Sequence, residues 1–141
     1  MLVRLLYASR CDKVSPEMIE AILARARERN PAQGITGILC HGGSVFMQVL
    51  EGGREAVNQL YNAIARDPRH HSVTLLHYEE ISERMFVGWT MGQVNLGRIN
   101  ASMLLKYGER AVLDPYCVTG QASMALLQEL IASAAIVGRT G

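Results

Sequence analysis

The stretch GITGILCHGGSVFMQVLEGG, residues 34–53, decides the fold class of this chain. It holds two apolar runs, Gly34 to His41 and Val45 to Leu50, with Gly42-Gly43-Ser44 between them. Short apolar runs joined by a glycine-rich turn are typical of a β-hairpin. We therefore expect two antiparallel strands here, with Gly52-Gly53 ending the second.

An amphipathic helix is predicted on each side of this hairpin. Upstream, Ser15-Pro16 provides a cap and a first-turn proline, and apolar residues follow at helical spacing. Pro31 disfavours helical geometry in the residue before it, so this helix should end near Asn30. Downstream, about Arg54 to Ala65 carries an apolar stripe before the stop at Asp67-Pro68.

Three further apolar segments have the length and residue types of strands. They are Leu2 to Ser9, Val73 to Ile81 and roughly Phe86 to Val94. The order is then βαββαββ, which predicts an α+β ferredoxin-like sandwich with two helices on one face of a mixed sheet.

The residues beyond Gly97 predict a C-terminal helical cap. Met103 to Tyr107 and Ala122 to Val137 have helical patterns and are joined by a loop that contains Pro and Gly. We expect residues 1–95 to form the main domain and residues 96–141 to form this cap.

The composition excludes several classes of protein. The 141 residues are 49% hydrophobic and 19% charged, which is typical of one folded domain. The 14 basic and 13 acidic side chains nearly balance, so neither a nucleic acid nor a membrane surface is an expected partner. The longest apolar stretch is far shorter than the roughly 20 residues of a membrane span, and no signal peptide is evident, so a cytoplasmic location is expected.

The cysteines and histidines indicate no metal site. Cys11, Cys40 and Cys117 are odd in number and widely spaced, which fits neither a disulfide scaffold nor a zinc site. His70 and His71 are adjacent and have no third ligand at a supporting spacing. We expect reduced thiols and no metal.

Two polar residues stand in otherwise apolar strands. Alternation puts Phe46, Gln48 and Leu50 on one face of their strand. If that face meets the helices, the Gln48 amide is buried and needs partners; if it faces solvent or bonds a neighbouring backbone group, no function follows. Tyr7 likewise has both a functional and a structural interpretation, because a strand tyrosine commonly packs in the core with its hydroxyl at the rim.

Other candidates have ordinary structural explanations as well. Asn30 can simply end its helix, and Arg69 can be a solvated loop residue or can bind a carbonyl or phosphate with its planar donors. Trp89 and Met91 would share one face of the last predicted strand. No nucleophile with a base and an orienting acid is recognisable, and no phosphate-binding loop of the Walker type occurs.

Taken together, these stretches resemble the BLUF domains, blue-light sensors that use FAD. The matching segments, which follow one another without large gaps over about residues 1 to 95, are Leu5 to Ser9, Asn30 with Gly34 to Leu39, Phe46 to Gly52, Asp67 to His71 and Arg84 to Met91. The C-terminal part resembles the helical cap of the short stand-alone members.

The resemblance implies non-covalent binding of FAD, with the flavin ring between the two helices and the sheet. In this family's pattern, Ile22 and Ile64 match the side chains on the ring faces, Asn30 and Arg69 those at its carbonyl end, and Asp67 and His70 polar groups around its edge and ribityl chain. Tyr7 and Gln48 match the central photochemical pair, with Gln48 also contacting the flavin. Trp89 and Met91 match residues that relay the signal.

The resemblance also implies a photosensor without net catalysis. Light would drive proton-coupled electron transfer from Tyr7 to the flavin, rearrange the hydrogen bonds of Gln48, and signal through the last strand and cap to a separate effector or regulator protein. A homo-oligomer is also expected. The alternatives are an acylphosphatase-like enzyme, which would need an arginine such as Arg10 after the first strand, or a small-molecule regulatory module on the same sandwich.

Overall fold

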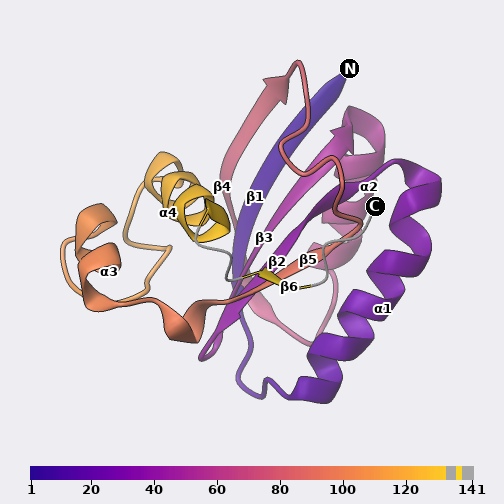
Figure 1. Ribbon diagram of the computed structural model, residues 1–141. Coiled ribbons are helices and arrows are strands. Elements are labelled where there is room, and N and C mark those ends of the chain that lie inside the picture. Colours follow the sequence, from indigo (N-terminus) through magenta and orange to yellow (C-terminus); the bar gives the residue numbers. More distant parts are fainter. Residues whose placement is uncertain (133–135, 138–141) are drawn as a thin grey trace.

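The computed structural model describes residues 1–132 and 136–137, which are built around one mixed sheet (Figure 1). The elements follow the order β1 (Leu2–Arg10), α1 (Pro16–Gln33), β2 (Thr36–Gly42), β3 (Val45–Gly53), α2 (Arg54–Ala65), β4 (His71–Ile81), β5 (Gly92–Asn95), the 3-10 turn η1 (Leu96–Arg98), α3 (Ala101–Tyr107), α4 (Gly120–Ala132) and β6 (Ile136–Val137). The predicted order βαββαββ and the ferredoxin-like α+β sandwich are confirmed.

The strands lie in the order β4-β1-β3-β2-β5-β6. Neighbours are antiparallel except β2 and β5, which are parallel. Helices α1 and α2 cover one face of the sheet, as predicted, and α3 and α4 lie on the opposite face (Figure 1). Two apolar cores result, one on each face.

The two central strands place Tyr7 beside Gln48. They are paired residues of β1 and β3, and strand alternation turns both toward α1 and α2. Their strand neighbours Leu6 and Met47 point to the other face and join the core under α4. The face that carries Gln48 is therefore covered by helices, and the solvent-face alternative is wrong.

Helix α1 continues past its predicted end at Asn30 to Gln33. Pro31 falls in the last turn, where its missing N–H removes only one helical hydrogen bond. Gly34 then ends the helix in the left-handed conformation, with φ of 69°, and its N–H donates to the carbonyls of Asn30 and Pro31.

The predicted strand from Phe86 to Val94 is wrong over most of its length, because β5 begins only at Gly92. The amides of Met85 and Phe86 donate instead to the carboxylate of Glu51, at 3.0 and 2.8 Å. Those two N–H groups are consequently satisfied by a side chain and not by a strand ladder.

The C-terminal cap packs directly on the sheet. Its helix α4 contributes buried side chains such as Leu127 to the core on that face. A Cβ atom at Gly120 would lie 1.9 Å from the carbonyl oxygen of Leu76, so α4 approaches β4 through a glycine. The helix predicted from Ala122 to Val137 ends at Ala132; residues 133–135 lie outside the described residues, and 136–137 form β6.

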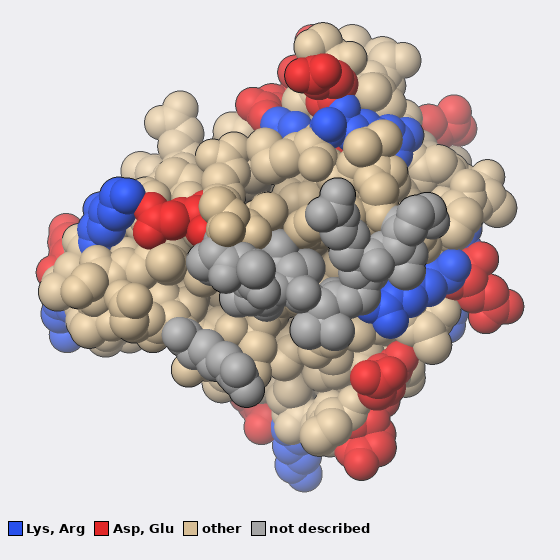
Figure 2. Space-filling view, in the orientation of Figure 1, with Lys and Arg blue, Asp and Glu red and all other residues tan. Residues whose placement is uncertain are grey.

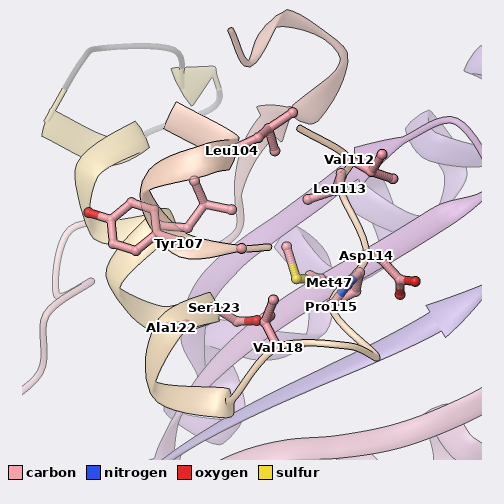
Figure 3. Close-up of a pocket in the computed structure, with 12 residues that line it drawn as sticks. Met47, Leu104, Tyr107, Val112, Leu113, Asp114, Pro115, Val118, Ala122 and Ser123 are labelled. Atoms are coloured by element: carbon pink, nitrogen blue, oxygen red, sulfur yellow. The ribbon is translucent and has the colours of Figure 1, made fainter. Parts of the chain in front are cut away.

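A small cavity of about 20 Å³ lies between the cap and the sheet, lined by residues such as Met47 and Tyr107 (Figure 3). It has room for about one water molecule. On the face drawn in Figure 2, acidic and basic side chains are interspersed, in keeping with their near-equal numbers. Among residues 1–132 and 136–137, no helix has both the length and the apolar character needed to cross a membrane.

Candidate functional site

A cavity of about 460 Å³ lies between α1, α2 and the sheet. This volume falls in the range of roughly 300–1,000 Å³ that is common for small-molecule sites. Eight of the predicted site residues line the cavity: Tyr7, Ile22, Asn30, Gln48, Ile64, Asp67, Arg69 and His70. The fold thus gathers side chains from β1, α1, β3, α2 and the turn after α2 around one space.

Tyr7 and Gln48 form a direct hydrogen bond at the sheet side of this cavity. The Tyr7 hydroxyl donates to Gln48 Oε1 at 2.5 Å, and the two residues are 4% and 5% exposed. Burial raises the pKa of Tyr7 well above its ordinary value, so the phenol keeps its proton at any physiological pH. The pair is a neutral donor and acceptor in a dry environment, where hydrogen bonds are stronger than in water.

The other end of the Gln48 amide contacts Met91. Gln48 Nε2 lies 3.4 Å from the Met91 sulfur, which is only a weak acceptor. Met91 is fully buried and belongs to the apolar core on the cavity side of the sheet. Gln48 therefore has one strong partner and one weak partner, and a change in its hydrogen bonds bears directly on Met91.

Asn30 has an unsatisfied amide. Its side chain lines the cavity and the residue is 3% exposed, yet its Nδ2 has no hydrogen-bond partner among the described residues. A buried donor without an acceptor costs about 1–3 kcal/mol. Such a donor at a cavity wall points to a ligand that supplies an acceptor, such as a carbonyl oxygen.

Asp67 and Arg69 are paired with each other at the cavity rim. The Arg69 guanidinium donates to both carboxylate oxygens of Asp67, at 2.6 to 3.1 Å, and its backbone N–H donates to one of them at 2.9 Å. This hydrogen bonding lowers the pKa of Asp67. The pair fixes the turn after α2 and keeps a planar set of N–H donors beside the cavity.

His70 links that turn to β1. Its Nε2 lies 2.6 Å from the carbonyl oxygen of Ile64, which can only accept, so this nitrogen carries the proton. In the neutral ring, Nδ1 then accepts from the Ser9 hydroxyl at 2.7 Å. Ser9 is fully buried and also lines the cavity. Sequence reasoning did not name Ser9 as a site residue, although its alternation with Tyr7 on β1 was a usable signal.

Trp89 lies on the other side of the sheet from this cavity. It is in the segment before β5, its ring centroid is 5.5 Å from that of Phe86, and both belong to the core that contains α4. The expectation that Trp89 and Met91 share a strand face is wrong, because neither belongs to β5. Two residues that are two positions apart consequently reach opposite cores.

Sequence reasoning missed several cavity residues. Arg25 and Arg29 line the cavity from α1, and Arg66 does so from the end of α2. The i, i+4 spacing of Arg25 and Arg29 beside Asn30 was a usable signal, since it puts both on one side of the helix. Glu51 and Arg27, which hold the segment before β5, gave no local signal because their partners are distant in sequence.

The described residues form no cluster of metal ligands, and the position of Arg10 weakens the acylphosphatase alternative. Among the described residues, no group of three or more His, Cys, Asp or Glu side chains is placed to hold a metal ion. Arg10 is engaged elsewhere: its guanidinium lies 4.4 Å from the centre of the Tyr116 ring and 3.8 Å from a carboxylate oxygen of Asp114.

Comparison with known proteins identifies the family. The sequence model described as "BLUF: Sensors of blue-light using FAD" matches residues 2–92 of this chain. The chain belongs to the BLUF family. It is thus a blue-light-sensing flavin domain.

BLUF relatives include both large and small proteins. The photoactivated adenylate cyclase subunit beta of Euglena gracilis is 39% identical over 92 residues, 64% of this chain but 11% of the relative. The blue light- and temperature-regulated antirepressor BluF of Escherichia coli (strain K12) is 39% identical over 87 residues, 61% of this chain and 22% of that protein. A solved structure of BlsA in its photo-activated state has 32% identity and a TM-score of 0.82, and the match covers 93% of this chain and 95% of BlsA.

Proposed function

We propose that this chain binds oxidised FAD in the 460 Å³ cavity and reports blue light to a separate protein through the segment before β5 and the cap. The buried hydrogen bond from Tyr7 to Gln48, at the wall of that cavity, is the observation that carries the proposal. It places a phenol and a bifunctional amide side by side, away from solvent.

The residues around the cavity fit a flavin. Asn30 Nδ2 is a buried donor that a ring carbonyl would satisfy. Ile22 on α1 and Ile64 on α2 offer apolar surfaces from two sides, and the Asp67–Arg69 pair adds polar groups at the rim. Oxidised flavin absorbs blue light and is a strong oxidant when excited.

Tyr7 and Gln48 perform the switch in this proposal. Burial keeps the phenol of Tyr7 protonated, so it can give up an electron and a proton together, and its hydrogen bond to Gln48 Oε1 provides the path for the proton. Once the electron and proton have returned, the amide of Gln48 is left in a different orientation or tautomer. That change alters the contact of Gln48 Nε2 with the Met91 sulfur. The net chemistry is zero and the hydrogen bonds differ.

The signal leaves the cavity through Met91 and Trp89. Met91 lies in the cavity-side core, and Trp89 lies in the core shared with α4. A shift of the segment that carries them therefore changes the packing on both faces of the sheet. We assign residues 1–95 to the sensor and residues 96–141 to the cap, whose outer surface contacts the effector or another copy of the chain. No catalytic role is assigned to the chain itself.

The test is a visible absorption spectrum of the purified protein, recorded in the dark and then under blue light. A bound flavin and a reversible red shift of its bands are expected, and the flavin released by heating should have the mass of FAD. Tyr7→Phe and Gln48→Leu should keep the flavin but lose the red shift. Asn58→Ala, at an exposed position of α2, serves as a control that keeps both.

A protein that takes up FAD stoichiometrically and shows no red shift would refute the proposal. Release of FMN instead of FAD would change the identity of the proposed cofactor and leave the rest of the proposal standing. A normal red shift in Tyr7→Phe would remove Tyr7 as the electron donor.

A further inference from the structure

The segment before β5, residues 84–91, is anchored to the sheet at several points. Near its start, the fully buried carboxylate of Glu51 holds two backbone N–H groups, as described above. Further along, the Trp89 carbonyl accepts a hydrogen bond from the N–H of Gly37 on β2, at 3.1 Å. Both contacts tie the segment to central strands.

A further contact ties the end of the segment to α1. The carbonyl oxygen of Met91 accepts from two N–H groups of Arg27, from Nη2 at 3.0 Å and from Nε at 3.3 Å. Arg27 is partly buried and has no acidic partner among the described residues. Its guanidinium is thus committed to one backbone carbonyl, the carbonyl of the residue whose sulfur contacts Gln48.

Arg27 stands apart from the cavity. Its helical neighbours Ala26 and Asn30 line the cavity, but Arg27 does not. Among the described residues, its hydrogen bonds reach the switch through the Met91 backbone carbonyl. Unlike the contacts of Glu51 and Gly37, the Arg27 contact joins the segment to helix α1, so it can release without breaking a contact to a strand.

We propose that Arg27 is a positioning residue for the light-sensing switch. By holding the Met91 carbonyl, it keeps the Met91 sulfur against the Gln48 amide and stabilises the arrangement described here over the light-induced one. This inference rests on the proposed function, because it concerns the lifetime of the switched state.

The experiment compares flavin-loaded wild-type protein with Arg27→Gln, Arg27→Lys and the control Arg110→Gln, which changes an exposed arginine in the loop before α4. The red shift and the half-time of its return in the dark are measured for each. In Arg27→Gln the shift should keep its size, since Tyr7, Gln48 and the cavity are untouched. The return should be about tenfold slower, equivalent to about 1.4 kcal/mol, because the described arrangement loses a charge-assisted hydrogen bond.

The conservative variant separates positioning from general loosening. Arg27→Lys keeps a cationic donor and should return at a rate between the wild type and Arg27→Gln, and Arg110→Gln should match the wild type. Backbone hydrogen exchange of residues 87–92 in the dark should be faster in Arg27→Gln, with exchange of β1 and β3 unchanged.

Two kinds of failure are distinguishable. If the wild type switches and Arg27→Gln returns within twofold of its rate, or faster, the inference is overturned and the proposed function stands. Unchanged hydrogen exchange at residues 87–92 in Arg27→Gln would also overturn the inference and leave the proposed function standing. A wild type that binds flavin and shows no light response overturns the proposed function and the inference together.

Discussion

Replacing Glu51 by Gln should lower the free energy of unfolding by about 3 kcal/mol. Glu51 is fully buried, and its Oε2 accepts from Arg4 Nε at 2.7 Å and from the Met85 N–H at 3.0 Å. Its Oε1 accepts from the Phe86 N–H at 2.8 Å. In Glu51→Gln the amide oxygen can still accept from the Phe86 N–H. The new NH₂ group, however, lies against two other donors, the Met85 N–H and the Arg4 guanidinium, and cannot accept from either. The guanidinium of Arg4 then keeps only the half-exposed carboxylate of Glu79.

The structure provides a matched control in an exposed ion pair. Arg54 and Glu80 form an ion pair of the same chemistry, with side chains 54% and 57% exposed. Exposed pairs contribute about 0–1 kcal/mol, so Glu80→Gln should change stability little. Because unfolding entropy is about 2 cal/mol/K per residue, 3 kcal/mol corresponds to a fall of about 10 °C in Tm for a chain of this size.

Thermal unfolding followed by far-ultraviolet circular dichroism checks this prediction. Glu51→Gln should melt about 10 °C below the wild type, and Glu80→Gln within about 3 °C of it. Equal melting temperatures for the two variants would show that the buried Glu51 carboxylate contributes no more to stability than the exposed Glu80 carboxylate. That result would refute the prediction.

The remaining predictions concern the cavity and the cap. Asn30→Ala should weaken flavin binding about tenfold, measured by fluorescence titration. The flavin-free protein should melt no lower than the wild type, because the substitution removes a buried donor that has no partner. Equal flavin affinities would mean that this amide does not contact the ligand. Gly120→Val should displace α4, since even a Cβ there would lie 1.9 Å from the Leu76 carbonyl oxygen. Fluorescence of Trp89, the single tryptophan, should shift to longer wavelength as its core opens, whereas Gly53→Ala, with open space around its Cβ position, should leave the emission unchanged.

The local signals in the sequence predicted the elements whose determinants are neighbours in the chain. Helix α2 spans Arg54–Ala65 as expected, because its apolar stripe and the Asp67-Pro68 stop are both local. The hairpin around Gly43 is likewise correct. The end of α1 was misplaced because the restriction from Pro31 is weaker than the cap that Gly34 provides three residues later.

Errors arose where a distant side chain decides the backbone. Phe86 has the residue type and surroundings of a strand, but the Glu51 carboxylate takes its N–H from 35 positions away. Nothing in the sequence pairs these two residues. The wrong expectation that Trp89 and Met91 share a face has the same cause. The alternation of side chains in a strand does not apply to this segment, because it is not a strand.

The candidate site was predicted mainly through the family resemblance. Eight of the residues named in advance line one cavity, although alternation alone left Gln48 on an undetermined face. Arg27 was not anticipated, because its partner is a backbone carbonyl and the identity of Met91 gives no indication of it.

The position of Trp89 and Met91 in opposite cores has a thermodynamic consequence. If Trp89 and Met91 move together as proposed, a molecule that binds the cap and prefers one position of Trp89 shifts the equilibrium at Met91 by the coupling free energy between the two sites. The reciprocity runs in both directions, whatever the chemical nature of that molecule. In the proposed mechanism, the absorption of the flavin under steady illumination would then report binding at a surface on the far side of the sheet from the cavity.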